Sequence, residues 1–258
     1  MALILKLFYK KYFYIMDEIT DPVTADRWVT SPIFLIGFIF SYNQIVKKIG
    51  PKLMENQKPF NIRNYMIVYN ILQIIINIKL MYQSYLVASS SPDLICTNSP
   101  HMASTIYTVR KEFFALKCLD CVETVFFVLR KSYRQISFLH VYHHCGMVLL
   151  GWIAFKYQAG DAQIHVAIIN CFIHAVMFVY YLLTSIDPEW KKNLLMKKSL
   201  TTMQLIQFMM FIVIYTYVII TKCPTFPMPF FGYIFVTQNT FMFCLFSDFY
   251  YKAYIKRK

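Results

Sequence analysis

The chain has 258 residues, of which 58% are hydrophobic and 15% are charged. This composition excludes a soluble globular protein and predicts a membrane protein, in which runs of about 20 apolar residues cross the bilayer. The net charge of +13 does not indicate nucleic-acid binding, because the basic residues lie between apolar runs, where the positive-inside rule places them.

The N-terminal residues 1–16 are apolar and aromatic and contain three lysines. A secretory signal would carry its charge first and a small-residue cleavage site last, and this segment has neither. We therefore expect an interfacial amphipathic helix. Residues 1–29, which include the polar loop Asp17–Asp26, form the predicted non-cytosolic N-terminal segment, and residues 251–258 form a basic cytosolic tail.

Seven apolar runs follow the N-terminal segment, and each is long enough to be read as a transmembrane helix. They make residues 30–250 one predicted seven-helix transmembrane domain. The predicted spans are residues 30–46, 64–87, 113–129, 136–155, 164–184, 200–221 and 230–250.

The distribution of lysine and arginine predicts the orientation. Sixteen of these residues fall in the odd-numbered loops and the C-terminal tail, whereas eight fall in the N-terminal segment and the even-numbered loops. The positive-inside rule then places the C-terminus in the cytosol and the N-terminus on the other side of the membrane.

Five of the seven cysteines lie inside predicted spans. Cys96 and Cys223 lie instead in short loops on the non-cytosolic side. That compartment is oxidising if the membrane is that of the endoplasmic reticulum. We therefore predict a disulfide between Cys96 and Cys223.

Three histidines, His140, His143 and His144, lie within five residues at the start of the fourth span. On a helix, His140 is one turn before both of the others, so the three rings crowd one end of an apolar segment. Ionisable groups are costly in a membrane and mark functional sites. The structural alternative is a hydrogen-bonded cluster at the membrane interface.

The third span carries Lys117, Asp120 and Thr124 on one helical face, with Glu123 beside them. Acidic residues within a span usually face the interior of the bundle, where they are part of a functional site. The alternative is a Lys117–Asp120 salt bridge that only holds helices together.

Further polar residues occur in the last three spans. They form stripes along the helices, and the stripes can converge on one space in the bundle. We therefore predict an all-α membrane protein whose seven transmembrane helices enclose a polar chamber and a long apolar tunnel. Such a space suits a substrate with a large anionic head and a hydrocarbon tail. The stripes are Asn170, His174, Met177 and Tyr181 in the fifth span, Thr201, Gln204 and Gln207 in the sixth, and Gln238 and Asn239 in the seventh.

These motifs resemble those of the ELO family of very-long-chain fatty acid elongases, the membrane 3-ketoacyl-CoA synthases. The resemblance extends from about Asp21 to the C-terminus and includes Asp21-Pro22, Trp28 and Lys58-Pro59-Phe60. Two departures are visible: Phe178 replaces a tyrosine, and the acids of the Lys-x-x-Glu-x-x-Asp-Thr motif are exchanged. The matching motifs are His140, His143 and His144 for His-x-x-His-His, Lys117, Asp120, Glu123 and Thr124, Asn170, His174, Met177, Tyr180 and Tyr181, and Thr201, Gln204 and Gln207.

The resemblance implies that a long-chain acyl-CoA condenses with malonyl-CoA, without cofactor or metal. We expect His143 to be the nucleophile, His174 to assist condensation, and His140 and His144 to orient His143. Lys117, Asp120 and Glu123 would complete the polar network. The residues expected to bind substrate are Asn170, Tyr180, Tyr181, Gln204 and Gln207 in the chamber, and Arg130, Lys131 and Arg134 at the CoA phosphates.

The resemblance also implies an endoplasmic reticulum membrane protein that works with a 3-ketoacyl-CoA reductase, a dehydratase and an enoyl reductase, and it is compatible with a homodimer. Three alternatives remain open. A di-iron desaturase or hydroxylase shares the His-x-x-His-His motif but needs many histidine ligands. This chain has six histidines, and two of them, His101 and His165, lie near the non-cytosolic side. A seven-helix receptor does not explain the intramembrane charges. A catalytically inactive elongase-like scaffold is compatible with the exchanged acids.

Overall fold

The structure is a computed structural model that describes residues 2–14, 16, 28–90, 95–96, 103–157, 162–223 and 229–256. Within these ranges the chain forms helices, turns and irregular segments but no strand, so the predicted all-α class is confirmed. The predicted polar loop Asp17–Asp26, His101 and the last two residues of the basic tail lie outside the described residues. The α-helices are α1 (Ala2–Phe13), α2 (Pro32–Gln44), α3 (Gly50–Leu53), α4 (Arg63–Ser89), α5 (Ala103–Asp120), α6 (Val122–Leu129), α7 (Phe138–Lys156), α8 (Ala162–Ile186), α9 (Leu194–Ile220) and α10 (Pro229–Tyr250).

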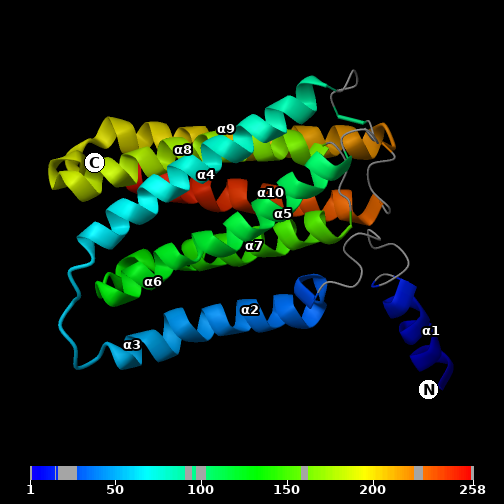
Figure 1. Cartoon of the computed structure of the whole chain (residues 1–258), viewed down its shortest axis with the longest axis horizontal. Helices are drawn as coiled ribbons and strands as arrows, with labels where there is room; N and C mark the ends of the chain where they lie inside the picture. The colour runs from blue at the N-terminus through cyan, green and yellow to red at the C-terminus, as the bar shows by residue number, and fades with distance from the viewer. Residues whose placement is uncertain are drawn as a thin grey trace.

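Each predicted apolar run lies on a helical rod of the bundle (Figure 1). The first rod runs from α2 through the π-helix Ile45–Ile49 into α3, and the third is α5 followed by α6. By length and composition, five helices in the described part of the chain could cross a membrane: α4, α7, α8, α9 and α10 with its extension. The other two rods fall outside this set because α2 has 13 residues and α5 carries charged residues.

The third rod begins ten residues before the predicted start at Phe113. The prediction excluded the charged residues Arg110, Lys111 and Glu112, but the structure includes them in α5. Arg110 is buried, and Glu112 forms an ion pair with Lys79 of α4 at 2.8 Å. The helix therefore extends beyond the predicted apolar run, because burial of Arg110 and the ion pair of Glu112 accommodate charges in it.

Side-chain caps determine where three of the helices begin. At the start of α2, the side chain of Ser31, which precedes Pro32, accepts a hydrogen bond from the Ile33 amide. At the start of α9, the Asn193 side chain accepts one from the Met196 amide. The Ser137 side chain accepts one from the His140 amide at 3.2 Å. Each cap satisfies one of the N–H groups left unpaired in the first turn. The cap at Ser137 therefore places the histidine cluster in the first two turns of α7.

The bundle is packed by antiparallel neighbours: α4 runs along α8, α5 along α7, and α9 along α10 (Figure 1). The Arg63 guanidinium, at the start of α4, donates hydrogen bonds to the Ser185 and Ile186 carbonyls at 2.8 and 2.6 Å. These carbonyls belong to the last turn of α8, where helical partners are missing. This capping contact fixes the register of α4 against α8.

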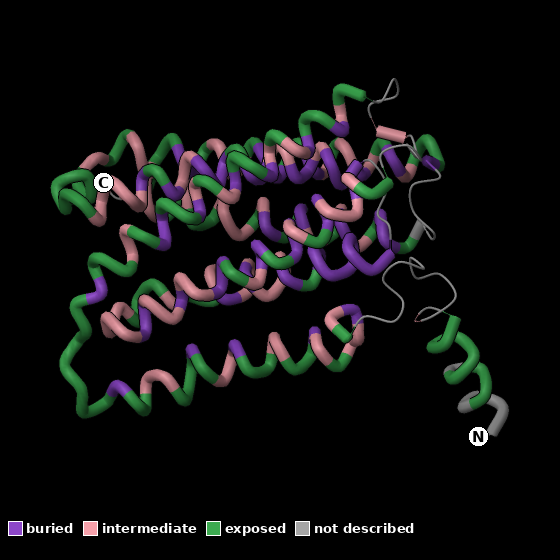
Figure 2. Tube along the Cα trace, in the orientation of Figure 1, coloured by how far each residue is buried: buried purple, intermediate pink, exposed green. Residues whose placement is uncertain are grey.

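Buried residues concentrate where α5, α7 and α8 run past one another, whereas the described side chains of α1 are exposed (Figure 2). The main apolar cluster contains stacked aromatic rings, including Tyr215 against Phe235 at 4.5 Å and Tyr157 against Phe231 at 4.6 Å between ring centroids. Its residues from α9 and α10 lie toward the end of the bundle away from the C-terminus. This half of the bundle is therefore filled by side chains.

Cys96, which follows α4, and Cys223, which follows α9, are joined by a disulfide with their Cα atoms 5.1 Å apart. The other five cysteines are free thiols, of which four lie in helices and Cys121 lies at the turn between α5 and α6. A cross-link between residues 127 positions apart constrains the unfolded chain strongly.

We predict that removal of this disulfide destabilises the fold. Cys96→Ser with Cys223→Ser should lower the free energy of unfolding by about 2–4 kcal/mol. The measurement is thermal unfolding in detergent with and without reductant, with Cys244→Ser as the matched control at an exposed free thiol. Equal mobility on reducing and non-reducing gels, with both thiols open to alkylation, would contradict the pairing.

Candidate active site

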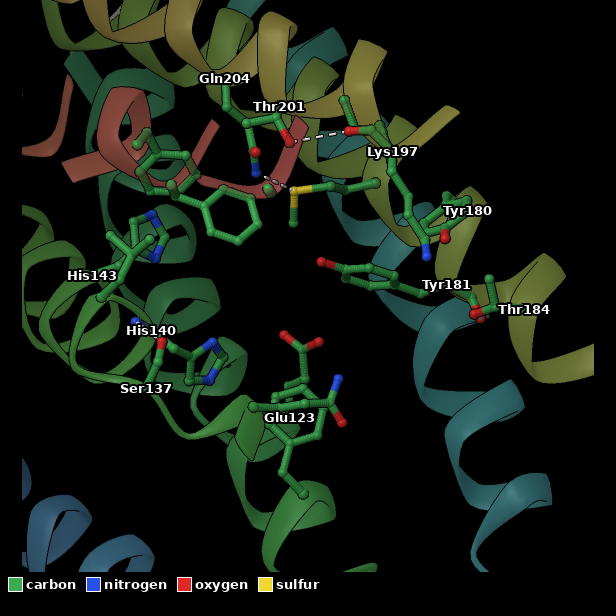
Figure 3. Close-up of a pocket in the computed structure, with 18 of the residues that line it drawn as sticks. Glu123, Ser137, His140, His143, Tyr180, Tyr181, Thr184, Lys197, Thr201 and Gln204 are labelled. Atoms are coloured by element: carbon green, nitrogen blue, oxygen red, sulfur yellow. Dashed lines mark hydrogen bonds between the residues drawn. The ribbon is translucent and has the colours of Figure 1, made fainter. Parts of the chain in front are cut away.

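A cavity of about 1230 Å³ opens at the end of the bundle that carries the C-terminus, and side chains from α4 through α10 line it (Figure 3). Most of the predicted site residues lie in this lining although they come from segments far apart in the sequence. The predicted residues in the lining are Asp120, Glu123, Arg130, Arg134, His140, His143, His144, His174, Tyr180, Tyr181 and Gln204.

Four predicted residues lie outside the lining. Lys117 is 1% exposed and pairs with Asp120 behind the wall. Asn170 and Gln207 are also buried, and the Asn170 amide donates to Gln207 Oε1 at 3.3 Å, which joins α8 to α9. Lys131 turns away from the cavity and donates from Nζ to the Glu55 carbonyl at 3.0 Å. In this arrangement these side chains support the walls rather than contact a ligand.

A short polar chain holds His140, the first of the three clustered histidines. Tyr42 OH lies 2.8 Å from Thr124 Oγ1, which lies 2.8 Å from His140 Nε2. The ring centroid of His144 lies 4.4 Å from that of His140 and 5.5 Å from that of His143. Thr124 is completely buried, so its bond with Tyr42 is shielded from water. The fixed His140 ring therefore forms a rigid neighbour for the other two.

His143 stands at the floor of the cavity, where its ring centroid lies 6.2 Å from that of Phe246 on α10. Gln238 of α10 packs closely against α7. It accepts a hydrogen bond from Tyr142 OH at its Oε1 at 2.6 Å, and its Nε2 lies so near Gly146 that a Cβ added there would be 2.5 Å away. Glycine at position 146 thus leaves room for this hydrogen bond, and Gln238, which the polar stripe singled out, supports the helix that carries His143.

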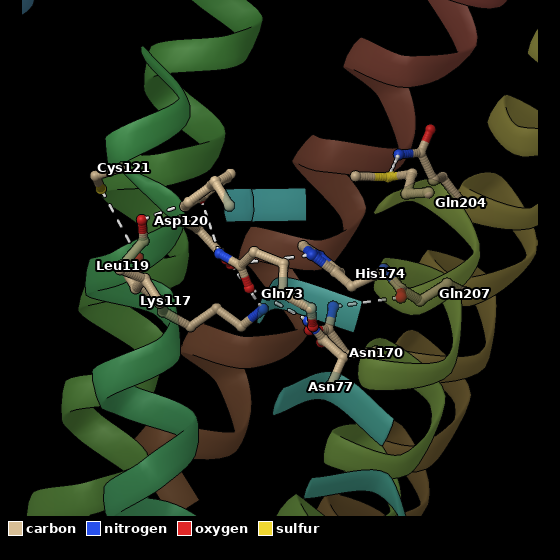
Figure 4. Close-up of polar contacts among 12 residues, drawn as sticks. Gln73, Asn77, Lys117, Leu119, Asp120, Cys121, Asn170, His174, Gln204 and Gln207 are labelled. Atoms are coloured by element: carbon tan, nitrogen blue, oxygen red, sulfur yellow. Dashed lines mark hydrogen bonds and ion pairs between the residues drawn. The ribbon is translucent and has the colours of Figure 1, made fainter. Parts of the chain in front are cut away.

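The Asp120 carboxylate is the centre of a buried network (Figure 4). Asp120 Oδ2 lies 3.1 Å from Lys117 Nζ and 3.9 Å from His174 Nδ1, and Asp120 Oδ1 accepts from Gln73 Nε2 at 3.0 Å. The opposite charge of Lys117 and the hydrogen bond from Gln73 compensate the burial of the carboxylate. His174, on α8, is thereby held beside a negative charge while it lines the cavity.

The two exchanged acids have different surroundings. Asp120 is bound by the network, whereas Glu123 extends into the cavity toward Tyr181 (Figure 3). Among the described residues, Glu123 has no hydrogen-bond partner. The structure therefore separates two carboxylates that the sequence placed in one network, and it leaves Glu123 able to accept a hydrogen bond from a ligand.

Phe178, the second departure from the family pattern, is 2% exposed and packs against Tyr69 at 5.9 Å and His174 at 6.1 Å between ring centroids. Its apolar ring fills the wall between α4 and α8. The packing explains why a residue without a hydroxyl is accommodated at this position.

Cationic side chains surround the open end of the cavity. Arg130, Arg134, Lys191, Lys197 and Lys252 contribute to the lining there. A surface of this charge attracts phosphate groups. Lys252 also forms an ion pair with Asp248 at 2.7 Å.

Sequence reasoning missed two groups of lining or supporting residues. Tyr69 and Gln73, on α4, contact the Asp120 region, and their spacing of four residues on an otherwise apolar helix was a usable signal. Tyr254 lines the cavity because the π-helix Tyr251–Ile255 continues α10 and brings its hydroxyl 3.3 Å from Thr201 Oγ1. No periodicity in the sequence indicated that turn.

The chain is similar to one known protein family over most of its length. Residues 27–258 match the ELO family, described as the GNS1/SUR4 family. Very long chain fatty acid elongase 7 from Drosophila melanogaster is 36% identical over 259 residues, which cover 98% of this chain and 78% of that protein. Human very long chain fatty acid elongase 4 is 33% identical over 258 residues, with 97% and 80% coverage, and rat elongase 7 is 32% identical over 244 residues, with 92% and 86% coverage.

We predict that Thr124 stabilises the site through its hydroxyl. Thr124→Val keeps the shape but leaves Tyr42 and His140 without this partner, which should cost about 1–3 kcal/mol of unfolding free energy. Thr124→Ser should retain most of the stability. Thermal unfolding in detergent tests both, with Thr108→Val as the control because the half-buried Thr108 donates to the Ser104 carbonyl within α5. A Thr124→Val protein as stable as the unsubstituted one would contradict the prediction.

Proposed function

The chain belongs to the ELO family of very long chain fatty acid elongases, and we propose that it condenses a long-chain acyl-CoA with malonyl-CoA. The products are a 3-ketoacyl-CoA longer by two carbons, CO2 and free CoA. The observation that carries this proposal is one cavity in which His143 and His174, from different helices, lie beneath a cationic opening. This arrangement matches a substrate that has an anionic head and a reactive thioester.

In the first step, a neutral His143 nitrogen attacks the acyl thioester carbonyl and forms an acyl-imidazole. The CoA thiolate leaves and takes up the proton that the imidazole releases, so free CoA departs. The neighbouring rings of His140 and the buried His144 hold the ring in place. The contact of His143 with Phe246 leaves the floor apolar, as an acyl chain requires.

In the second step, malonyl-CoA loses CO2, and the electrons of the broken C–C bond form a thioester enolate. The enolate carbon attacks the acyl carbon, the His143 imidazole leaves, and a proton from the medium restores it. His174 would stabilise the developing negative charge on the thioester oxygen, which is the most effective role for a positioned polar group. Asp120 and Lys117 would orient His174 for this role.

The cationic opening would hold the CoA phosphates through Arg130 and Arg134, together with Lys197 and Lys252. Tyr180, Tyr181 and Gln204 line the space between this opening and His143, where they can contact the pantetheine arm. Glu123, which has an unused acceptor, can receive a hydrogen bond from an amide N–H of that arm.

The acyl tail would extend beyond His143 between α9 and α10. The cavity lining ends near Gln204 and Leu245, and Phe208 packs against Phe246 just below, at 5.1 Å between ring centroids. Deeper still, Tyr215 OH donates to Gln163 Oε1 at 2.9 Å. We propose that the tunnel follows this apolar line, that Phe208 must move aside for a tail, and that Tyr215 limits its depth.

The same proposal includes the membrane arrangement. All seven rods would span the endoplasmic reticulum membrane, with the N-terminus and the disulfide in the lumen and the cavity opening in the cytosol. The cationic residues at the opening support this orientation, because basic residues collect on the cytosolic side. Other enzymes, a 3-ketoacyl-CoA reductase, a dehydratase and an enoyl reductase, would then process the product, and a homodimer would be compatible with this arrangement.

We predict that purified protein in detergent converts radiolabelled malonyl-CoA and a long-chain acyl-CoA into a 3-ketoacyl-CoA two carbons longer. His143→Ala should abolish both product and covalent labelling by acyl-CoA, whereas the control His165→Ala, in α8 outside the cavity lining, should retain them. Full turnover and labelling in His143→Ala would exclude the acyl-imidazole. No product from folded protein with any acyl-CoA would favour the inactive scaffold.

We predict that Phe208→Ala shifts the preference toward longer acyl-CoA substrates, because it removes the ring below His143. The measurement compares product yields across a panel of acyl chain lengths. Phe172→Ala is the matched control, since Phe172 is 49% exposed on the outer face of α8. An unchanged chain-length profile in Phe208→Ala would contradict the proposed path of the tail.

A further inference from the structure

We propose that Gln73 of α4 is a positioning residue for the condensation, because it holds the Asp120 carboxylate toward His174. This inference rests on the proposed function, in which His174 assists the second step. Gln73 is 0% exposed and does not line the cavity, so it acts through Asp120 rather than on a ligand.

The neighbours of the Gln73 side-chain amide determine which of its two atoms is the nitrogen and which is the oxygen. Its nitrogen, which has two N–H donors, donates to Asp120 Oδ1 at 3.0 Å and to Tyr69 OH at 2.8 Å. Its oxygen accepts from Asn77 Nδ2 at 3.4 Å. The reversed amide would put its oxygen against the carboxylate, so this is the orientation that satisfies all partners.

Tyr69 and Gln73 of α4 each donate one hydrogen bond to the third rod, at the point where its helix is interrupted. α5 ends at Asp120 and α6 begins at Val122. The Tyr69 hydroxyl donates to the Leu119 carbonyl at 3.2 Å, and Gln73 binds the Asp120 side chain. Carbonyls at a helix end lack intrahelical partners, so a neighbouring donor fixes the local path of the backbone. Tyr69 and Gln73 therefore set both the position and the direction of Asp120.

The orientation of the Asp120 carboxylate determines how close its negative charge lies to the His174 ring. Asp120 Oδ2 lies 3.1 Å from Lys117 Nζ and 3.9 Å from His174 Nδ1. The longer distance exceeds that of a hydrogen bond, so the negative charge of the carboxylate acts on His174 electrostatically. The bond from Gln73 occupies Oδ1 and leaves Oδ2 between the lysine and the histidine. Without Gln73, the carboxylate can rotate to place both oxygens on Lys117 and away from His174.

The test is a double-mutant cycle of Gln73→Met with Asp120→Asn, measured as the rate of 3-ketoacyl-CoA formation. Methionine keeps the length of the side chain but cannot donate. We expect Gln73→Met to lower kcat by roughly 10- to 100-fold, the range typical of partners that orient a functional side chain, with KM for acyl-CoA unchanged. In the Asp120→Asn background the same substitution should have an effect of less than about twofold, because coupled residues are not additive.

The matched control is Gln83→Met, the same change on the same helix, at a residue whose Oε1 is buried without a hydrogen-bond partner in the described structure. It should keep the kcat of the unsubstituted protein. If Gln73→Met does not fold, Gln73→Asn, which is too short to reach Asp120, takes its place in the cycle. A kcat within twofold of the unsubstituted protein, or effects that add fully with Asp120→Asn, would overturn the inference. Absence of product from the unsubstituted protein would instead overturn the proposed function.

Discussion

The burial of the Lys117–Asp120 ion pair is the constraint on which the site depends. A buried ion pair is stable only when further hydrogen bonds satisfy both charges. Gln73 of α4 and His174 of α8 meet that requirement from two other helices. The antiparallel packing of α4 on α8, fixed at its end by Arg63, is what brings them to the same level.

The bundle divides into a hollow half and a filled half, and the candidate nucleophile lies at their boundary. Polar residues line the cavity at one end, and stacked aromatic rings such as Tyr215 and Phe235 fill the other. His143 stands between the two environments, beside Phe246. A group at such a boundary can contact a charged head and an apolar tail of the same molecule, which is the requirement set by an acyl-CoA.

The sequence was sufficient for the helices, because hydropathy over long segments records burial in a membrane. It was also sufficient for the family, because the histidine and glutamine motifs are specific. It failed at the start of α5, where Arg110 and Glu112 have partners that hydropathy cannot detect. It did not separate Asp120 from Glu123, and it missed Gln73, because both depend on contacts between helices distant in the chain.

The placement of the shorter acid in the wall and the longer one in the cavity has a consequence for conformational entropy. Asp120 has one rotatable side-chain bond fewer than a glutamate, so less freedom is lost when the network fixes it. Glu123 lines the cavity, and no hydrogen bond of this network fixes its side chain. In the proposed mechanism, its carboxylate would follow a ligand whose shape changes from thioester to enolate, while Asp120 would keep His174 in place.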